Sequence, residues 1–575
     1  MENHITQATS KRWIISPLIP PSVNQNLAEF SPLLRQLLYN RGISDASSAN
    51  AFVDCASSAP TDPFLIKDMP AAVELLHSAI QSGISIAVYG DYDVDGVTST
   101  ALLYEFLQQL GSTPRVYIPN RFEEGYGLNL EAIQQLASEG IGLIITVDCG
   151  IRSVAEVALA RELDMRVILS DHHLPGQDLP PADAIINPRQ PGDPYPYKHL
   201  AGVGLAYKIV QAYLATYRIE GMQADNWLDL VAIGTVADLA PLTDENRALV
   251  HAGIQVMRSM NRQGLYSLAQ VSGIKLEKIN AGNIGFGIGP RLNAAGRLDS
   301  AMAAFDLLTT RDLVQAGTLA QQLDSQNSHR KDITLQIQTV AVESALKADP
   351  TVPIIFAASP DFNEGVVGLA ASRITEALYK PAIIGHQSDS FVVASCRSIA
   401  EFDITRALDA CSDLLIRYGG HSMAAGLTVS TENLPALLER LNTQARKTLA
   451  GLELAPVLGI DREISLDKLR AEHVPGIMED VSLLEPTGRG NPEALFCSRN
   501  LQVKQARAVG DGQHLKLTLR AGTTDYDGIA FRQGYWLEEM PNLVDIAYAF
   551  DINNYLGRQT LQLNIKDIKP SVDAR

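Results

Sequence analysis

The feature that most constrains this chain is a run of three aspartates at alternate positions, directly after an apolar segment. Residues 84–88 predict a buried strand, and Asp91, Asp93 and Asp95 follow it closely. Three carboxylates at alternate positions of an extended chain point to one side, about 6–7 Å apart for each step of two residues. Like charges repel by about 4 kcal/mol per pair at 4 Å for an effective dielectric near 20. We therefore expect a cation among them, and a divalent metal ion is the simplest.

Length and composition are typical of a large soluble protein with reduced cysteines. The chain has 575 residues, which exceeds a single hydrophobic core and predicts about three or four domains. Hydrophobic residues make up 46% of it, and no run approaches the roughly 18 apolar residues of a membrane span. The amino-terminal residues lack the basic and apolar segments of a secretory signal. Five cysteines without CxxC spacing argue against a zinc or disulfide framework and favour the reducing cytoplasm.

The net charge of −18 is weak evidence about partners. Nucleic-acid affinity usually comes from a basic surface, so this charge argues against non-specific duplex binding. It leaves room for a local basic groove, and metal-binding carboxylates contribute part of the acidic excess.

Strands and helices alternate from residue 71 to about 245, which predicts βαβ units around a parallel sheet. The predicted strands are 84–89, 115–119, 142–147, 166–170 and 184–187. The predicted helices between them are 99–110, 130–138 and 154–162. Ligands of such sheets bind beyond the carboxyl ends of the strands.

Polar side chains follow four of these strands at the point where each strand ends. They are Asp91, Asp93 and Asp95 after the first, Asn120 and Arg121 after the second, Asp148 after the third, and Asp171, His172 and His173 after the fourth. An aspartate after a strand is often only a helix cap or turn residue, which explains one such position. Acids and paired histidines after four strands are better explained by a shared site at one edge of the sheet.

Asp238 is a further candidate ligand. It stands alone in the apolar run 231–242. A buried lone carboxylate needs a partner or a metal ion, so we add Asp238 to the acidic residues of the sheet edge.

Residues 285–297 form a glycine-rich segment that contains Arg291, Asn293 and Arg297. Glycine lets the backbone approach a ligand closely, and arginine suits bidentate contact with phosphate. A plain surface loop is the alternative, and the segment alone favours it.

The rest of the chain predicts a long helix and two further domains. Residues 311–346 have amphipathic spacing with few breakers, and Asn327, Arg330 and Lys331 lie within one turn of that helix. Strands at 352–358, 382–385 and 391–395 and a helix at 366–378 indicate a second α/β domain. Alternating runs at 501–506, 515–519, 544–550 and 560–565 indicate a small antiparallel barrel, for which a five-stranded oligonucleotide-binding (OB) barrel is the natural candidate.

These motifs together resemble those of the DHH phosphoesterases. Asp-Tyr-Asp-Val-Asp-Gly at 91–96, Asp148 before Cys-Gly, the Asp171-His172-His173 triplet, and Asp238 in Gly-Thr-Val-Ala-Asp follow the order of that family's four motifs. Gly419-Gly420-His421 resembles the associated DHHA1 domain. The similarity spans nearly the whole chain and is closest to the bacterial single-stranded-DNA-specific 5′→3′ exonucleases of that family.

The patterns and the resemblance predict an α/β fold in which a parallel-sheet DHH domain is joined by a long helix to a smaller α/β DHHA1 domain, with a C-terminal all-β OB-like barrel. The expected parts are a segment capping the first domain (1–70), the DHH domain (71–310), the connecting helix (311–350), the DHHA1 domain (351–454) and the single-strand-binding barrel (455–575). Two departures from the family pattern lie outside the metal motifs. Asn363 stands where a histidine of Trp-His-x-Gly is expected, and residues 486–492 read Pro-Thr-Gly-Arg-Gly-Asn-Pro rather than Pro-Phe-Gly-x-Gly-Asn-Pro.

The residue types of the centre suit two Mn²⁺ or Mg²⁺ ions, and the imidazole tilts the preference toward Mn²⁺. Two ions about 3.5–4 Å apart can activate a water and stabilise the attacking and leaving oxygens of a phosphodiester. The expected ligands and catalytic residues are Asp93, Asp95, Asp148 as the bridging carboxylate, His172 and Asp238. Asp91 and His173 are either ligands or groups that orient ligands and water. For His173, a core histidine paired with a carboxylate is an equally good alternative.

The resemblance implies a substrate with a phosphate at its 5′ end. We expect Arg121, Ser395 and Arg397 to hold this phosphate, because arginine and hydroxyl donors match its oxygens. A surface charge is the alternative for Arg121. Contacts to the DNA backbone or the scissile phosphate are expected from Arg291, Asn293, Arg297, Gly420 and His421. Tyr126 is expected either to stack on a base or to pack in the core.

The resulting prediction is a metal-dependent exonuclease that degrades single-stranded DNA from 5′ to 3′ in repair and recombination. One alternative is a hydrolase of short oligonucleotides or pyrophosphate, which would lack the barrel. Another is a catalytically inactive scaffold, which would have lost ligands. The family implies a single-strand binding protein and a RecQ-type helicase as partners, a monomer, no membrane association and a cytoplasmic location.

Overall fold

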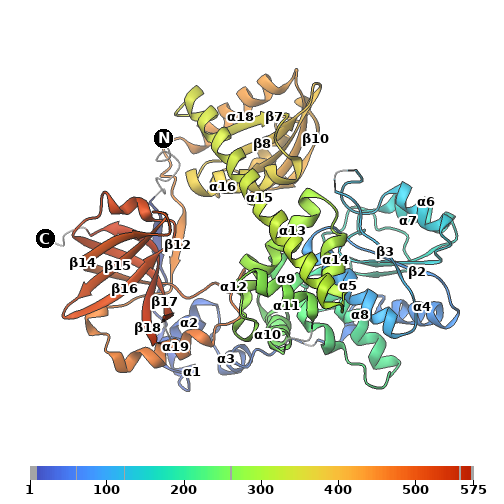
Figure 1. The fold of residues 1–575 in the computed structure, drawn as a ribbon, viewed down its shortest axis with the longest axis horizontal. Coiled ribbons are helices and arrows are strands. Elements are labelled where there is room, and N and C mark those ends of the chain that lie inside the picture. The colour runs from blue at the N-terminus through green and yellow to red at the C-terminus, as the bar shows by residue number, and fades with distance from the viewer. Residues whose placement is uncertain (1–9, 60, 122, 260–261, 556–557, 572–575) are drawn as a thin grey trace. The chain divides into compact units, whose positions relative to one another are not determined.

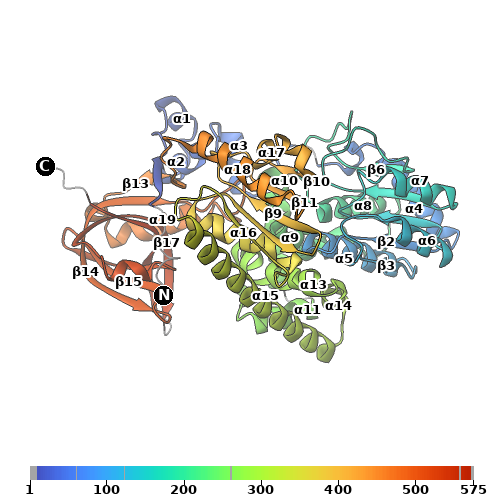
Figure 2. The ribbon, with the colours of Figure 1, turned by 90° about the horizontal axis from the view of Figure 1, so that it is seen from above.

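The computed structural model describes residues 10–59, 61–121, 123–259, 262–555 and 558–571. They form two compact units, whose elements are labelled in Figures 1 and 2. Unit 1 comprises residues 1–44, 331–482 and 494–575, and unit 2 comprises residues 45–330 and 483–493. The boundary falls inside one continuous helix, α15 (Leu313–Ala348), which confirms the long helix predicted from the sequence.

Unit 2 is built on a five-stranded parallel sheet in the order β3-β2-β4-β5-β6. Its strands are β2 (Ile86–Tyr89), β3 (Arg115–Tyr117), β4 (Leu143–Thr146), β5 (Arg166–Ser170) and β6 (Ala184–Ile186). Every pairing is parallel, so the carboxyl ends of all five strands lie at one edge. The five predicted strands and the parallel sheet are thereby confirmed.

Helices cover both faces of this sheet because successive strand residues point to opposite sides. Ile86 and Val88 belong to a core shared with residues of α4 (Met69–Gln81), α5 (Val94–Gln109), α8 (Gly202–Thr216) and α9 (Leu228–Ala237). Ala87 and Tyr89 belong to a second core shared with α6 (Leu130–Ser138) and α7 (Val154–Glu162). The other α-helices that lie wholly in this unit are α3 (Ala46–Val53), α10 (Asp244–Arg258), α11 (Gln263–Val271), α12 (Ala281–Asn283), α13 (Gly289–Leu298) and α14 (Met302–Thr309).

The glycine-rich segment 285–297 is helical, so the expected surface loop is wrong. It comprises most of a π-helical turn, η5 (Ile284–Ile288), followed by α13. Its glycines permit close packing between elements, since a Cβ on Gly296 would lie 2.5 Å from the carbonyl oxygen of Tyr92. Ile284 is fully buried at the start of the turn. The segment therefore holds α13 against the aspartate-rich motif.

Unit 1 contains a mixed five-stranded sheet in the order β10-β11-β9-β8-β7. Its strands are β7 (Ile355–Ser359), β8 (Ala382–Gln387), β9 (Phe391–Arg397), β10 (Leu415–His421) and β11 (Ala424–Ser430), and its helices are α16 (Glu364–Leu378), α17 (Ile404–Asp409) and α18 (Leu434–Leu449). Only β7 and β8 pair in parallel. The three predicted strands and the helix predicted at 366–378 are confirmed, whereas β10 was not predicted because two adjacent glycines weaken its strand pattern.

The carboxyl-terminal part of unit 1 is a closed five-stranded barrel. Its strands are β14 (Phe496–Val509), β15 (His514–Ala521), β16 (Thr524–Ala530), β17 (Leu543–Tyr555) and β18 (Arg558–Pro570). They pair in the order β14-β15-β16-β18-β17, and β17 pairs back with β14 to close the barrel. This architecture confirms the predicted OB-like barrel. The expected antiparallel pairing is wrong for one pair of strands, because β16 and β18 pair in parallel. No sequence pattern indicated β16, because Asp525, Asp527 and Gly528 are unfavourable in strands.

The amino-terminal segment belongs with unit 1. We expected residues 1–70 to cap the first α/β domain, but residues 1–44 are grouped with the barrel-containing unit. β1 (Arg12–Ile15) pairs in parallel with β12 (Val457–Ile460). Ser31, the N-cap residue of α2 (Pro32–Asn40), also donates a hydrogen bond of 2.5 Å to Asp480. These contacts at the start of the chain are long-range in sequence, so its local pattern does not reveal them.

Among the described residues, no helix combines the length and the apolar content needed to cross a bilayer. The 36-residue α15 is long enough, but charged and polar residues interrupt it throughout.

A buried arginine links two helices that lead to the carboxyl edge of the sheet in unit 2. The guanidinium of Arg262 lies 2.7 Å from Glu105 on α5 and 2.7 Å from Asp229 on α9. α5 begins beside the aspartate-rich motif, and α9 ends next to Asp238. The ion pairs therefore fix the relative position of two elements that carry candidate ligands.

Replacing Arg262 with methionine is expected to lower the free energy of unfolding of unit 2 by about 3–5 kcal/mol, because two carboxylates would stay buried without their cation. Guanidinium chloride denaturation followed by circular dichroism measures this loss. Arg115→Met breaks a half-exposed pair with Glu139 and serves as the control, with little expected change. Equal stability of the two variants would contradict the structural role of Arg262.

Candidate metal centre

The aspartate-rich motif spans the turn between β2 and α5. Asp93 is the N-cap residue of α5, and its Oδ1 accepts a hydrogen bond from the backbone N–H of Gly96 at 3.0 Å. This cap starts the helix at Val94, so the chain does not stay extended over all three aspartates. Asp95 lies in the first helical turn instead. As a result, Asp91 and Asp93 share a different group of neighbours from Asp95.

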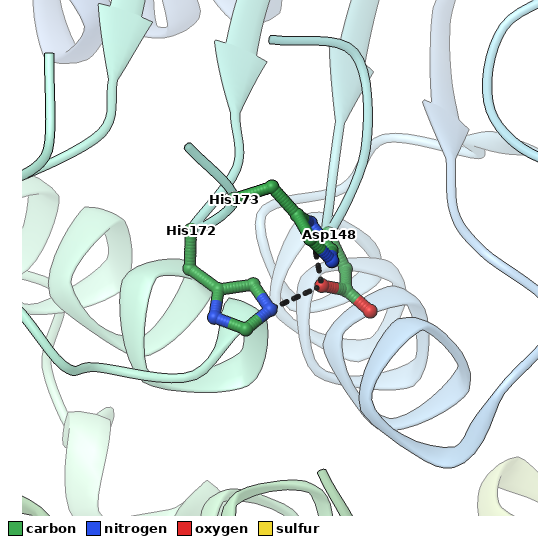
Figure 3. A group of neighbouring side chains, drawn as sticks. All are labelled: Asp148, His172 and His173. Carbon is green, nitrogen blue, oxygen red and sulfur yellow. Dashed lines mark ion pairs between the residues drawn. The ribbon is translucent and has the colours of Figure 1, made fainter. Parts of the chain in front are cut away.

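Asp148 and two histidines meet beyond the carboxyl ends of β4 and β5 (Figure 3). Nε2 of His172 lies 3.1 Å from Oδ1 of Asp148, and Nδ1 of His173 lies 4.0 Å from the same oxygen. Asp148 is buried and has a φ of 62°, a left-handed conformation that is uncommon for a residue with a side chain. Such backbone strain often occurs where the fold fixes a functional side chain.

Three overlapping sets of side chains bring possible metal-ligating atoms within 4.8 Å of one another. They are Asp91, Asp93 and Asp148; Asp148, His172 and His173; and Asp95, His172 and Asp238. Asp148 and His172 each belong to two sets, so the sets form one continuous centre. Every residue predicted as a metal ligand lies in it.

Burial and mutual repulsion raise the pKa values of the carboxyl groups in this centre. Burial, followed by the charge of Asp93, raises the pKa of Asp91 to about 8. Burial and the charge of Asp238 raise the pKa of Asp95 to about 7, and burial and Asp93 do the same for Asp238. The pKa of Asp148 also lies well above its usual value, chiefly through burial. A cation in the centre would relieve this repulsion.

Several buried polar atoms of the centre have no hydrogen-bond partner among the described residues. They are Oδ1 of Asp91, Oδ1 of Asp148 and Nε2 of His172. Burial lowers the pKa of His172, which keeps its imidazole neutral and able to ligate through a nitrogen lone pair. Buried acceptors that are left unpaired are unfavourable, so oxygen and imidazole ligands aimed at one place fit a divalent metal ion.

Asp171 orients the imidazole of His173 by a hydrogen bond. Its Oδ1 lies 2.8 Å from Nδ1 of His173, and its two oxygens accept hydrogen bonds from the backbone N–H groups of His173 and Ile151. Burial tends to lower the pKa of His173, but the hydrogen bond to Asp171 and the charges of Asp171, Asp238 and Asp95 together raise it above the usual value. The side chain of His173 is 45% exposed. His173 is therefore paired with a carboxylate, as one alternative held, but it is not a core residue.

Asp95 also serves as a cap for a neighbouring helix. Its Oδ2 accepts the N–H of Gly202 at 2.7 Å and its Oδ1 accepts the N–H of Val203 at 2.8 Å, at the start of α8. Residue 201, the N-cap position of α8, provides no side-chain cap. A Cβ on Gly202 would lie 2.7 Å from Cβ of Asp148, so the close approach of α8 to the centre requires glycine.

Three arginines gather beside the aspartate-rich motif. The guanidinium of Arg121 lies 5.0 Å from the ring centre of Tyr92. Burial, followed by the charges of Arg121 and Arg330, lowers the pKa of Arg297 to about 10, and the charge of Asp93 opposes this effect. Arg121 is thus part of a cationic cluster next to the centre, rather than an isolated surface charge.

The other residues predicted on the glycine-rich segment differ in their contacts. Arg291 pairs with Asp324 at 2.8 Å and donates to the carbonyl oxygen of Gly287, so it braces the π-helical turn. Asn293 lies on α13 between Arg291 and Arg297, and its role at the substrate stays a prediction.

Tyr126 lies over the centre and not in the core. The residue is 54% exposed, and its ring meets the ring of His173 edge-on at 5.8 Å. Its hydroxyl group donates to the backbone carbonyl oxygen of Asp148 at 3.3 Å. Core packing is therefore wrong for Tyr126, and base stacking stays a prediction.

The predicted substrate residues of unit 1 lie on its mixed sheet. Ser395 and Arg397 of β9 approach Gly368 of α16, where a Cβ would lie 3.3 Å from Oγ of Ser395 and 3.4 Å from Nη2 of Arg397. Gly420 has a φ of 150°, and a side chain there would collide with β11, so this glycine is needed for the β10–β11 pairing. His421 ends β10 and is exposed. Their contacts with substrate stay predictions.

Sequence reasoning placed Asp171 at the sheet edge without giving it a role, and it did not connect Arg330 or Gly202 with the centre. Asp171 precedes the two histidines and could have been identified as their orienting carboxylate from that position alone. Arg330 lies on α15 within one turn of Asn327, but the sequence does not show that it comes near Arg297. Gly202 lies in an apolar helix, and no local signal marks its contact with Asp148.

Comparison with known proteins agrees with this architecture. Residues 85–235 match the DHH family, N-terminal domain; residues 351–447 match the DHHA1 domain; and residues 460–567 match the RecJ OB domain. The single-stranded-DNA-specific exonuclease RecJ of Escherichia coli (strain K12) is 36% identical over 567 residues, which cover 94% of this chain and 96% of that protein. The chain belongs to the RecJ family.

Other members of the RecJ family are similar over comparable lengths. RecJ of Bacillus subtilis (strain 168) is 38% identical over 568 residues, covering 97% of this chain and 71% of that protein. The crystal structure of RecJ in complex with Mn²⁺ from Thermus thermophilus has a TM-score of 0.83 at 30% identity, covering 98% of this chain and 80% of that one. A second structure of the same protein contains Mg²⁺. The two metals named in these structures are those that the ligand types of this centre suit.

Gly202→Ala is expected to weaken metal binding about 10–100-fold, because its methyl group would displace Asp148 while the fold stays intact. Isothermal titration with Mn²⁺ measures the affinity and the number of ions bound. Gly204→Ala is a matched control on the same helix, since its Cβ would meet only Leu200 at an ordinary 3.4 Å. Equal Mn²⁺ affinities of the two variants would show that α8 does not shape the centre.

The stabilisation of the protein by Mn²⁺ is expected to grow with pH. Asp91, Asp95 and Asp238 have raised pKa values in the fold, so their contribution to the stability of the metal-free protein is fully present below about pH 4. This contribution is lost as the pH rises toward 7–8 and the three carboxyl groups ionise. Bound metal offsets the repulsion that then appears. Thermal unfolding with and without Mn²⁺ at pH 6 and 8.5 measures the effect, and Asp91→Asn should reduce it. A shift in Tm that is equal at both pH values would contradict the raised pKa values.

Proposed function

We propose that this chain hydrolyses the phosphodiester bonds of single-stranded DNA with two divalent metal ions held at the carboxyl edge of the parallel sheet. The observation that carries this proposal is the overlap of the ligand sets at Asp148. One carboxylate shared between two sets is what a pair of adjacent ions requires. Membership of the RecJ family, with relatives named single-stranded-DNA-specific exonucleases, supports the substrate.

We assign Asp91, Asp93 and Asp148 to one metal position, and Asp95, His172 and Asp238, together with Asp148, to the other. Divalent ions bound there supply a water of lowered pKa and neutralise charge on the attacking and leaving oxygens. Hydrogen bonds within the chain hold the centre in place: Asp171 orients His173 beside the ligands, and the N–H groups that begin α8 orient the ligand Asp95. Neutral His172 presents a lone pair without requiring loss of a proton.

We propose that the phosphate groups of the strand are bound by arginines on both units. Arg297 lies near Asp93, and the charges of Arg121 and Arg330 act on Arg297, so this cationic cluster can stabilise the scissile phosphate. Ser395 and Arg397 lie together over Gly368, a pair of donors that suits the oxygens of a 5′-phosphate. Recognition of that terminal group is the basis for 5′→3′ polarity.

The barrel favours long substrates over short ones. An OB barrel commonly grips single strands through stacking and backbone contacts over several nucleotides. A hydrolase of dinucleotides or pyrophosphate has no use for it. An inactive scaffold is disfavoured because all the expected ligands are present and lie together.

We further propose that the chain acts as a monomer in the cytoplasm, in DNA repair and recombination, with a single-strand binding protein and a RecQ-type helicase as partners. All five cysteines are free thiols, which supports a reducing compartment. The partners and the monomeric state rest on the family resemblance.

Asp148→Asn is expected to lower exonuclease activity by about a thousandfold, equivalent to about 4 kcal/mol of transition-state stabilisation, because both metal positions lose a charged ligand. The assay uses DNA labelled at either end, single-stranded or duplex, with Mn²⁺ or Mg²⁺. Loss of 5′-terminal mononucleotides from the single strand alone supports the proposal. Loss from the 3′ end, equal cleavage of duplex, or full activity of the variant would refute it, and faster cleavage of dinucleotides would favour the short-substrate alternative.

A further inference from the structure

A short segment that follows the α/β part of unit 1 in the sequence returns to the metal-binding unit. Residues 483–493 are grouped with unit 2, and they include the Pro-Thr-Gly-Arg-Gly-Asn-Pro motif that departs from the family pattern. They pack on the turn that follows Asp238: the N–H of Leu242 donates to the carbonyl oxygen of Arg489 at 2.6 Å. A Cβ on Gly488 would lie 2.8 Å from Leu242, so this packing is close.

Arg489 lies at the tip of a rigid turn. Gly488 and Asn491 exchange backbone hydrogen bonds of 2.8 and 3.2 Å across it, and Gly490 has the left-handed φ of 79° that such a turn needs. The buried side chain of Asn491 donates to two carbonyl oxygens of the same segment. The backbone of Arg489 is therefore fixed, and its side chain is exposed.

Arg489 reaches back toward the metal centre. Its Nη1 donates to the carbonyl oxygen of Leu239 at 3.3 Å, and Leu239 directly follows the candidate ligand Asp238. Its guanidinium has four further N–H groups available for an acceptor. Its charge acts on Asp238, whose pKa it lowers.

Arg189 approaches the centre from another element. It follows β6, the one strand of the parallel sheet to which the sequence assigned no functional residue. Its Nε donates to the carbonyl oxygen of Lys198 at 2.9 Å. Its charge acts on both His172 and Asp238, and the charge of Arg489 also acts on Asp238.

Within the described part of the chain, neither arginine has a carboxylate oxygen within 4.0 Å, although the chain carries a net charge of −18. Asn246 joins the segments that the two arginines contact, because its amide donates to the carbonyl oxygens of both His199 and Pro241. Two guanidinium groups thus lie near the metal centre, and their N–H groups donate to no acidic residue of the described chain. An anion brought to the metal ions would meet them.

We propose that Arg189 and Arg489 form an anion subsite on the Asp238 side of the metal centre, which binds a phosphate group. This proposal rests on the proposed function and adds a second phosphate position to it. The phosphate comes either from an internucleotide linkage of the strand or from the released 5′-mononucleotide. Arg489 occupies the variable position of the Pro-Phe-Gly-x-Gly-Asn-Pro pattern, so the subsite distinguishes this chain from relatives with another residue there.

Binding of a fluorescent oligothymidylate to the full-length protein tests the subsite without turnover. Anisotropy is measured in EDTA over a range of salt concentrations for the wild type, Arg189→Met and Arg489→Met. Each variant should bind more weakly, and the slope of log affinity against log salt should fall by about 0.7 for each phosphate group that the variant no longer neutralises. Arg489→Lys keeps the charge and should keep most of the slope.

Arg161→Met is the matched control. Arg161 is an exposed arginine on α7 and, like Arg489, it donates to one carbonyl oxygen, in its case at 3.2 Å. However, α7 packs on the face of the sheet opposite to α8 and α9. Its slope should equal that of the wild type. Slopes of Arg189→Met and Arg489→Met that also equal the wild-type slope would overturn the subsite.

Competition with thymidine 5′-monophosphate distinguishes the two sources of phosphate. If the nucleotide displaces the oligonucleotide from the wild type but not from Arg489→Met, the subsite binds the product. If the nucleotide competes equally in the wild type and in Arg489→Met while their salt slopes differ, the subsite binds a phosphate of the strand. Hydrolysis by the wild type is measured separately, so an inactive wild type counts against the proposed function, whereas unchanged slopes count against the subsite.

Discussion

Repulsion among buried carboxylates is the constraint on which the rest of this structure depends. Asp91, Asp95 and Asp148 are removed from water at the same edge of the sheet, where their ionised forms are unfavourable. The fold offsets this in two ways. Backbone N–H groups of α8 bind Asp95, and the charge of the Arg297 guanidinium acts on Asp93. The lone pairs that remain converge where a divalent cation fits.

Glycines make this concentration of charge possible by letting helices approach one another closely. A Cβ on Gly234 would lie 2.9 Å from an oxygen of Asp95, and one on Gly96 would lie 2.5 Å from the backbone of Asp91. With Gly202 and Gly296, these positions allow α5, α8, α9 and α13 to meet around one motif. The helices give up intrinsic propensity at each glycine, which tertiary packing must outweigh.

The sequence predicts most of the sheet and the ligands, because alternating strands and helices place their polar residues at one edge. It could not predict that Asp93 and Asp95 have different neighbours. The same residues are compatible with an extended backbone and with a capped helix, and tertiary packing decides which of the two forms. The helix over 285–297 was hidden for a related reason, since its glycines lower local propensity and its stabilising contacts, such as that with Tyr92, are distant in sequence. Arg189 belongs to no motif, and Arg489 occupies the variable position of one, so the sequence does not show that either lies near the centre.

Residues 483–493 make the metal-binding unit discontinuous along the chain. Arg247 is 2% exposed, and it donates hydrogen bonds to the carbonyl oxygens of Leu483 and Glu485. A gene fragment that ends at residue 330 would leave this guanidinium without those acceptors, at a cost of about 1–3 kcal/mol. Recombination that exchanged the barrel for another module would have to preserve this eleven-residue insert. Residues 483–493 and the metal-binding unit are therefore expected to be inherited together.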